Sequence, residues 1–371
     1  MSRACSAFVT LFVLVVLLPQ SVAAAGALER WQETAMSLVT QLEGSSFDAV
    51  TLDSDCQGLS LGKEQYAVAV NSTRELFLEM DRTAGPGGVA GIVAATVTQR
   101  RDEIAAFVAQ SMAGDAARMP RVRSWQQISV GGVWRDLDDG ECKQGQKRSV
   151  GAKDLRLKPG FEADLKAFLK HPVSVRAQET LIKRLAARAI DRATCWARAE
   201  RNAAAPTFKE YLFFFDYLVQ NGDSFTANGL LQQTALRIAF NGSIADARQD
   251  PAAVAKMAQL VDWLGADFPH MRNKAIKTDH GDYARANAAA WQARFKAGQI
   301  SKSDLRLAYV GLMRAMLGNN QWAYNAMNRR GTIAFFGGLA NGRTYDASVF
   351  AALVAAAGEM PPADVQGITC N

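Results

Sequence analysis

Carboxylate side chains gather in one polar stretch of the sequence, residues 42–65. Glu43 ends a segment in which apolar residues recur at helical spacing, and Asp53 and Asp55 follow within twelve residues. Glycosidic bond cleavage needs an acid to protonate the leaving oxygen, and many such enzymes use a second carboxylate to activate water or to stabilise the oxocarbenium-like centre. A Glu between apolar neighbours can have the raised pKa that this acid needs. We therefore expect Glu43 to be the general acid and Asp55 or Asp53 to be the second carboxylate.

Each of these carboxylates also has a structural interpretation. Glu43 stands at a helix C-terminus, where a negative charge is unfavourable, and an ordinary exposed carboxylate is the alternative there. Asp53 and Asp55 are residue types that shape turns. Residues 58–62 match the GxSxG pattern of hydrolases, but polar residues precede them instead of the buried strand that a nucleophile elbow needs, so we do not expect a Ser60 nucleophile.

The elements that must position these residues are predicted to be mainly helical. Apolar residues recur at helical spacing in residues 27–42. The same pattern predicts further helices at 65–80, 93–112, 161–199, 208–240, 251–264, 282–295, 303–316 and 347–357. Short strands and turns are expected at 47–61, a loop with a hairpin at 119–159, and a Gly-rich turn at 331–345. The predicted class is mainly α, an α+β helical bundle with a small β-hairpin element beside the site.

The first 25 residues have the features of a secretory signal. Arg3 precedes an apolar run over residues 7–18, and small residues at 23–25 suit cleavage. A membrane anchor is the alternative, but this run is shorter than the ~18–20 residues that a span needs. We expect an exported protein, secreted or periplasmic, in which residues 26–371 form the folded domain, as one body or as two lobes.

Export determines how the cysteines are interpreted. Four cysteines follow the signal, namely Cys56, Cys142, Cys195 and Cys370. An even number in an oxidising compartment predicts two disulfides, with three pairings open. No cysteine or histidine spacing typical of zinc occurs in the sequence, and we expect neither a metal nor a cofactor.

Three segments carry a resemblance to a known family. They are FDAVTLDSDCQGLSLGKEQY (47–66), FFFDYLVQNGDSF (213–225) and NRRGTIAFFGGLANGRTYD (328–346). In this order they resemble the lysozyme superfamily, which includes chitosanases and many phage and bacterial cell-wall hydrolases. They are most similar to uncharacterised bacterial lysozyme-like proteins, whose first segment runs Asn-Phe-Asp-Gly-Gln-Gly-Leu-Ser-Phe-Gly. The resemblance implies a helical lysozyme-like fold in which Glu43 is the acid.

The resemblance also implies substrate contacts from all three segments. These would come from Gln57, Ser60, Gln65, Asn221, Arg343 and Tyr345. A helix stop is the alternative for Asn221, and core packing or loop bracing is the alternative for Arg343 and Tyr345. Asp216 lies within an apolar run, and we expect it to be a buried structural acid.

Some residues of the first segment depart from the family pattern, which puts in doubt whether this segment contacts the substrate as it does in the family. Asp53 stands where the pattern has Asn, and Cys56 replaces a Gly. Glu64 replaces an apolar residue before the Gln, and Tyr66 replaces a Trp after it.

Charge bears on the polymer that such an enzyme would cleave. The chain has a net charge of +6 and an isoelectric point near 9.1. This favours an anionic wall polymer such as peptidoglycan over cationic chitosan, and we expect neither a nucleic-acid nor a membrane partner after signal cleavage.

The prediction is an exported glycosidase. A glycan-binding protein without activity is the second hypothesis, and a helical-toroid polysaccharide lyase using Lys277, His280 and Tyr283 is the third.

Overall fold

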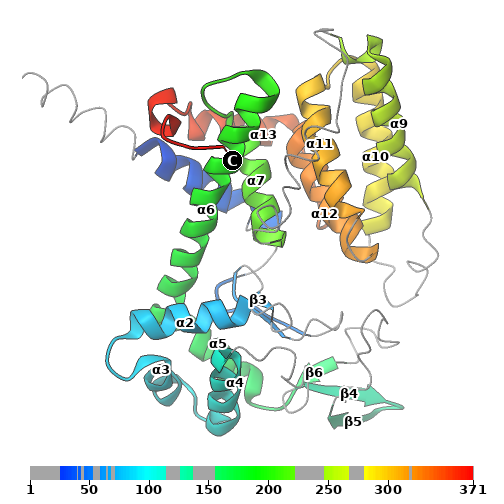
Figure 1. The fold of residues 1–371 in the computed structure, drawn as a ribbon. Helices are drawn as coiled ribbons and strands as arrows, with labels where there is room; N and C mark the ends of the chain where they lie inside the picture. Colours follow the sequence, from blue (N-terminus) through cyan, green and yellow to red (C-terminus); the bar gives the residue numbers. More distant parts are fainter. Residues whose placement is uncertain are drawn as a thin grey trace, which may run out of the picture. The chain divides into compact units, whose positions relative to one another are not determined.

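The structure is mainly helical and carries three small antiparallel sheets within its described residues (Figure 1). This computed structural model describes residues 26–39, 41–42, 46–52, 59–63, 66–67, 72–113, 126–136, 155–221, 246–266, 280–316 and 320–370. The predicted mainly α class is confirmed. No helix of the described residues is long and apolar enough to cross a membrane.

The chain divides into two compact units. Unit 1 comprises Met1–Leu42, Leu185–Phe268 and Asp279–Asn371, and unit 2 comprises Glu43–Arg184 and Pro269–Thr278. The division falls within the long helix α6 (Pro172–Arg201).

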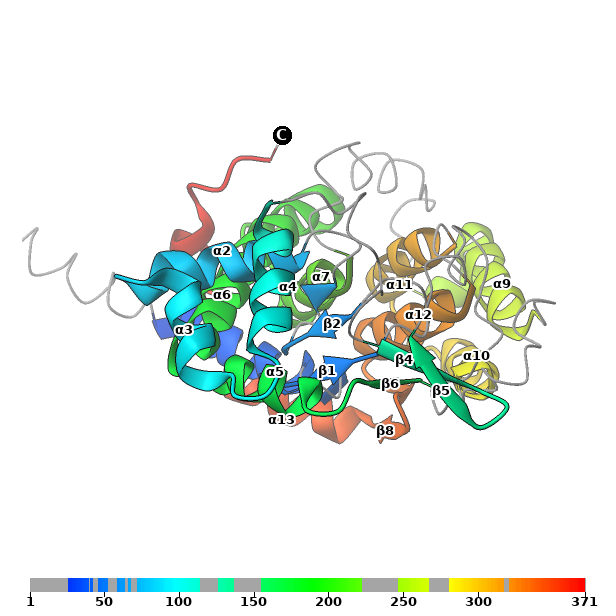
Figure 2. The same ribbon diagram turned by 90° about the horizontal axis from the view of Figure 1, so that it is seen from below.

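Unit 2 combines two small sheets with helices. Its first sheet has the order β1 (Val50–Thr51), β2 (Ser60–Leu61) and β3 (Tyr66–Ala67). Its second sheet has the order β5 (Val133–Asp136), β4 (Gln126–Val130) and β6 (Leu155–Leu157) (Figure 2). The helices are α2 (Ser72–Ala84), α3 (Gly88–Thr96), α4 (Arg101–Ala113) and α5 (Phe161–Lys170). Edge-to-face contacts of Phe77 with Phe107 and Phe168 lie in the core that these helices share.

The single helix that we predicted at 93–112 is two helices, α3 and α4. The buried carboxylate of Asp164 on α5 accepts backbone N–H groups from Thr98, Gln99 and Arg100, at 2.7–3.1 Å. These groups lie at the start of α4, where no helical carbonyl is available to them. A partner more than sixty residues away in sequence therefore stabilises the break between the two helices.

Unit 1 contains most of the helices. They are the helix at residues 26–42, α7 (Phe208–Asn221), α9 (Pro251–Gly265), α10 (His280–Lys296), α11 (Lys302–Ala315), α12 (Asn320–Phe335) and α13 (Ala347–Ala357), with short 3₁₀ turns η4 (Ala247–Gln249) and η7 (Pro362–Val365). A hairpin of β7 (Gly338–Ala340) and β8 (Arg343–Tyr345) joins α12 to α13. The helices α9 to α12 lie side by side (Figure 1).

Buried aromatic side chains hold the first helix against α7. The Trp31 ring lies 5.5 Å from that of Phe208 and 5.3 Å from that of Tyr211, between ring centroids. The Trp31 indole N–H donates to the Gly358 carbonyl at 3.0 Å. The apolar run over residues 211–218 is buried throughout, so this part of the predicted helix belongs to the core.

The Gly-rich turn that we predicted at 331–345 begins later than expected. The helix α12 continues through Gly331 to Phe335. A Cβ atom at Gly331 would lie 2.2 Å from the buried Trp291 ring. This glycine thus allows a close approach of two helices, and the turn-forming part begins only after Phe335.

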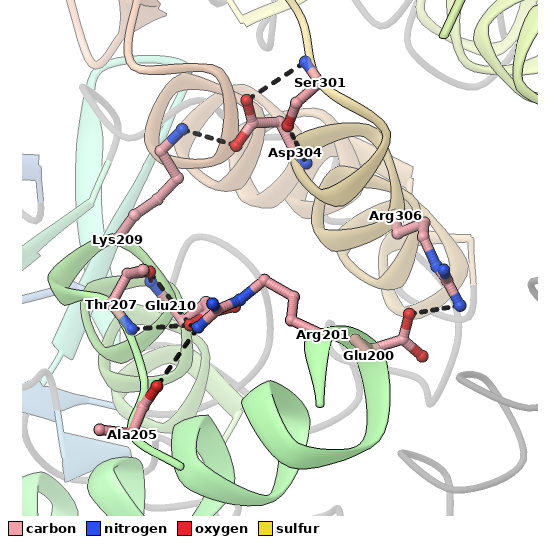
Figure 3. A network of polar contacts seen from close by, with 9 residues as sticks. All are labelled: Glu200, Arg201, Ala205, Thr207, Lys209, Glu210, Ser301, Asp304 and Arg306. Carbon is pink, nitrogen blue, oxygen red and sulfur yellow. Dashed lines mark hydrogen bonds and ion pairs between the residues drawn. The ribbon is translucent and has the colours of Figure 1, made fainter. Parts of the chain in front are cut away.

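A network of polar contacts fixes the start of α7 (Figure 3). The Glu210 carboxylate accepts the Thr207 N–H at 2.7 Å, and the Thr207 hydroxyl accepts the Glu210 N–H at 3.2 Å. This is a capping box, which satisfies N–H groups at the helix start. Arg201, from the end of α6, pairs with the same carboxylate at 2.7 Å.

The start of α11 is fixed in the same network (Figure 3). Ser301 and Asp304 form a capping box, and Lys209 of α7 pairs with Asp304 at 2.6 Å. Glu200 of α6 pairs with Arg306 of α11. Three helices of unit 1 are therefore joined at their ends by charge-assisted contacts.

One disulfide of the described residues joins Cys195 to Cys370. The Arg198 guanidinium, one turn further along α6, donates to the Val365 carbonyl at 2.8 Å and to the Ile368 carbonyl at 2.5 Å. The disulfide and this arginine together attach the C-terminal segment to α6. Cys56 and Cys142 lie outside the described residues.

Candidate functional site

The structure describes part of the predicted site. Residues outside the described part are Glu43, Asp53, Asp55, Gln57 and Gln65. Ser60 lies in β2, half-buried, between Thr51 of β1 and Ala67 of β3. Asn221 is the last residue of α7, which agrees with the helix stop that the sequence predicts, and its side chain is outside the described part. The structure describes the elements directly before and after Glu43.

Leu42, the last described residue of the helix before Glu43, contacts the β7–β8 hairpin. Leu42 is fully buried, and its carbonyl accepts a hydrogen bond from the Asn341 side-chain amide. The last carbonyls of a helix have no partner within the helix, so a side-chain donor at this point satisfies a group that otherwise needs water. The position of the residue before Glu43 is therefore fixed by a residue almost three hundred positions later in the chain.

The turn that carries Asn341 has a demanding backbone conformation. Asn341 and Gly342 link β7 to β8, with φ angles of 46° and 76°. Two positive φ values in succession are those of a type I′ turn, for which Asn-Gly is a favoured pair. The turn type directs the Asn341 side chain, and Asn is one of the few residues other than Gly that adopt this conformation at low cost.

The second and third segments of the resemblance meet in a buried ion pair. Asp216 of α7 accepts from Arg329 of α12, with the Nε–Oδ1 distance at 3.1 Å. Both side chains are at most 1% exposed. Asp216 is thus the buried structural acid that we expected, and its partner is an arginine of a neighbouring helix. A buried pair of this kind is costly to break, because the remaining charge has no solvent.

A second buried arginine lies beside this pair. The Arg330 guanidinium carbon lies 4.5 Å from the centroid of the Tyr217 ring. Burial lowers the pKa of Arg330 to about 10, and the nearby Asp216 opposes this shift. Arg330 therefore remains charged at neutral pH. The arginines of this segment stabilise the contact between α7 and α12.

Two predicted contact residues lie on β8. Arg343 is exposed, whereas Tyr345 is 3% exposed and belongs to the core of unit 1. Burial raises the pKa of the Tyr345 phenol, and the positive charges of Arg343 and Arg329 oppose this shift. Tyr345 is thus neutral at physiological pH. Of the two residues, only Arg343 is accessible for a contact with a ligand.

The chain after Glu43 enters the first sheet of unit 2, and Gln178 of α6 joins two of its turns. The buried Gln178 side chain donates to the Phe47 carbonyl at 3.0 Å and accepts the Lys63 N–H at 2.9 Å. Gly62 has a φ of 72°, and a Cβ atom there would lie 2.3 Å from the Gln178 oxygen. One glutamine therefore fixes the turn before β1 and the turn after β2.

Two residues of the segment 63–66 have structural roles in unit 2. The Lys63 ammonium lies 4.7 Å from the centroid of the Phe47 ring, a cation–π contact. Tyr66 is 6% exposed and packs in the core of unit 2. Its ring therefore offers little surface on which a sugar ring can stack.

The described residues hold no group of three or more His, Cys, Asp and Glu that could bind a metal ion. Of the residues considered for a lyase, Lys277 lies outside the described part, as does the side chain of His280, the first residue of α10. Tyr283 lies half-buried on α10. The lyase hypothesis therefore stays a prediction.

Sequence reasoning missed three residues that position these elements, namely Asn341, Gln178 and Arg329. The Asn-Gly pair at 341–342 is a hairpin signal in the sequence, but it does not reveal which carbonyl the amide contacts. Gln178 stands 131 residues from Phe47, and no local pattern links them. Arg329 lies in a segment that we noted only for its resemblance.

Comparisons with known proteins give no relative for this chain. No protein-family model, no curated protein and no solved structure matches it.

Proposed function

We propose that the protein is an exported glycoside hydrolase that cleaves a cell-wall amino-sugar polymer, with peptidoglycan favoured over chitosan. Glu43 is the general acid in this proposal. The basic charge of the chain, +6, supports an anionic polymer as the substrate. The disulfide between Cys195 and Cys370 is consistent with an oxidising compartment such as the periplasm or the extracellular space.

The observation that carries the proposal is the hydrogen bond from Asn341 to the Leu42 carbonyl. An acid catalyst must be held within a fraction of an ångström of its productive position by residues that are themselves fixed. Leu42 is buried, and the amide that holds it stands in a turn of defined conformation. The residue directly before Glu43 is thus fixed from an element that the resemblance had selected independently.

The element that follows Glu43 supports the same proposal. A helix precedes Glu43 and small antiparallel strands follow it, where the sequence predicts short strands and turns at 47–61. Gln178 fixes two turns of that sheet, on either side of the segment that contains Asp53 and Asp55. The turns that flank the predicted second carboxylate are thus fixed within unit 2.

The proposed chemistry is proton transfer to the leaving oxygen. Protonated Glu43 donates to the glycosidic oxygen as the bond to the anomeric carbon breaks, and positive charge develops on the sugar ring. Asp55 or Asp53, as a carboxylate, stabilises that charge or takes a proton from the attacking water. If neither does so, the cleavage is intramolecular, as in lytic transglycosylases: a group of the sugar itself attacks instead of water.

A glycan-binding protein without activity is the second candidate. The departures from the family pattern at Glu64 and Tyr66 motivate it, because they alter the segment that follows the predicted carboxylates. A binding protein retains affinity for the polymer but releases no reducing ends.

The purified protein should be incubated with peptidoglycan and, separately, with chitosan. The hydrolase proposal predicts a loss of turbidity and the appearance of reducing ends on peptidoglycan. Co-sedimentation with the polymer in the absence of any release would favour the binding protein. Absence of both binding and release on the two polymers would contradict the proposal.

A further inference from the structure

A groove of about 810 Å³ lies in unit 1 between α10 and the β7–β8 hairpin. Ala286, Ala290 and Arg294 line it at intervals of four residues, so they share one face of α10. Leu339 and Thr344 line it from the hairpin, where they are cross-strand partners with side chains on the same face. Its volume falls within the ~300–1,000 Å³ of small-ligand sites.

The hairpin wall of this groove is fixed to α10 by hydrogen bonds. Asn287 donates to the Leu339 carbonyl at 2.9 Å and accepts the Leu339 N–H at 2.7 Å. The Trp291 indole N–H donates to the Gly337 carbonyl at 2.7 Å. A Cβ atom at Gly338 would lie 2.4 Å from the Thr332 hydroxyl, so this close approach requires glycine. The groove is therefore formed before any ligand binds, which lowers the entropic cost of binding.

Phe336 lines the same groove in an unfavourable backbone conformation, with a φ of 50°. Positive φ is uncommon for a bulky residue and persists only where the surroundings impose it. Here the Phe336 ring stacks on Phe350 at 4.6 Å between centroids, and the Lys209 ammonium lies 4.2 Å from its centroid. Strain of this kind concentrates at binding sites and active sites.

Arg294 is a cation that lines the groove. The Arg294 guanidinium is half-buried, and a Cβ atom at Gly337 would lie 2.9 Å from its Nη1 atom. It makes no hydrogen bond or ion pair with any residue that the structure describes. Arg285, on the same helix, is paired with Asp282. A half-buried guanidinium with free donors binds a carboxylate in a bidentate manner.

A carboxylate acceptor also lines the groove. Asp346 uses its Oδ1 atom to cap α13, accepting from the Ser348 and Val349 N–H groups at 2.9 and 3.1 Å. Its pKa is below the usual value, chiefly because of the hydrogen bond from the Ser348 hydroxyl, so it is ionised at neutral pH. Its Oδ2 atom has no hydrogen bond among the described residues and remains an acceptor for an N–H group.

We propose that this groove binds a short peptide with small apolar side chains and a free C-terminal carboxylate. The carboxylate pairs with Arg294, the side chains lie along Ala286 and Ala290, and a peptide N–H donates to Asp346. The peptide supplies the three groups that complement the lining of the groove: an anion for the arginine, small apolar side chains for the alanines, and an N–H donor for the aspartate. This site is independent of the proposed glycosidase activity.

The test is calorimetric titration of the purified protein with N-acetyl-alanyl-alanine and with its C-terminal amide, which differ only in the charge of the carboxylate. We expect the acid to bind at least about tenfold more tightly than the amide, as a charge-assisted hydrogen bond implies. Arg294→Gln should remove this preference, and Arg285→Gln, the matched change on the same helix, should retain it.

Equal binding of acid and amide would overturn the proposal, as would no binding of either at millimolar concentration. An unchanged preference in a folded Arg294→Gln variant would do the same. The comparison of acid with amide uses the unaltered protein, so it stands even where a variant does not fold.

Discussion

Asn341, in the turn between β7 and β8, donates its side-chain amide to the carbonyl of Leu42, the residue directly before Glu43. This contact joins the first helix of unit 1 to its last hairpin. Asp216 and Arg329 join α7 to α12 in the same unit. The second and third segments that we selected by resemblance thus contribute the contact at Leu42 and the ion pair between α7 and α12.

Substitutions of Asn341 should separate the contribution of its side-chain amide from that of its positive φ. Asn341→Gly keeps the positive φ but removes the amide, and it should lower the free energy of unfolding by about 1 kcal/mol. Asn341→Ala removes the amide and also disfavours the φ of 46°, which adds about 1–2 kcal/mol. Urea unfolding of the two variants measures the difference. Equal stability of Asn341→Gly and the unaltered protein would show that the amide contributes nothing.

Gly62→Ala should be much more destabilising than Gly85→Ala, although both glycines have a φ of 72°. The backbone cost of about 1–2 kcal/mol is common to both substitutions. At Gly62 the new Cβ atom also lies 2.3 Å from the Gln178 oxygen, whereas at Gly85 no atom lies within 4 Å. The excess loss in thermal unfolding measures the contact with Gln178. In a Gln178→Ala background the extra loss caused by Gly62→Ala should be smaller. If the extra loss persists in that background, the new Cβ atom does not clash with Gln178.

Asp216→Asn should lower the free energy of unfolding by about 3–5 kcal/mol, because it removes the carboxylate that pairs with the buried Arg329. Asp282→Asn is the matched control in the same unit. Its pair with Arg285 is exposed, with side chains 76% and 55% accessible, and its loss should cost less than about 1 kcal/mol. Chemical unfolding of both variants tests the comparison. Similar losses for the two substitutions would contradict a structural role for the buried pair.

Asp164 should make the stability of unit 2 sensitive to acid. Burial by itself would raise the pKa of this carboxyl, but the N–H groups of Arg100, Thr98 and Gln99 outweigh burial and lower it. Its bonds therefore contribute fully above the unfolded pKa of ~3.9, and that contribution is lost as the pH falls through the lower folded value.

Asp164→Asn should lower stability at neutral pH by about 2 kcal/mol and flatten its decline below pH ~4. Asp102→Asn, an exposed change in the first turn of α4, is the control and should leave the acid profile of the protein nearly unchanged. Denaturation followed by circular dichroism between neutral and acid pH provides the measurement. An Asp164→Asn profile parallel to that of the unaltered protein would refute this assignment.

Features that depend on neighbouring residues were predictable from the sequence. The helix α13 has the predicted bounds, 347–357, and the capping box of Ser301 and Asp304 is present. Features that depend on distant partners were not predictable. The break before α4 depends on Asp164, and the continuation of α12 through Gly331 depends on a close approach to Trp291.

The candidate site also has a part that the sequence could predict and a part that it could not. Residue type and order were enough to select Glu43, Asp53 and Asp55, which lie outside the described residues and remain predictions. The residues that fix the neighbouring elements, Asn341 and Gln178, act across 299 and 131 positions of the chain. No periodicity or local motif in the sequence reports a contact of that length.

The central claim is that Glu43 protonates a glycosidic oxygen. We would measure reducing ends released from peptidoglycan by the unaltered protein, by Glu43→Gln and by Glu33→Gln, a matched change at an exposed position of the same helix. The account predicts release by the unaltered protein and by Glu33→Gln, and loss of release by Glu43→Gln with binding to the polymer retained. Equal release by all three proteins would contradict it.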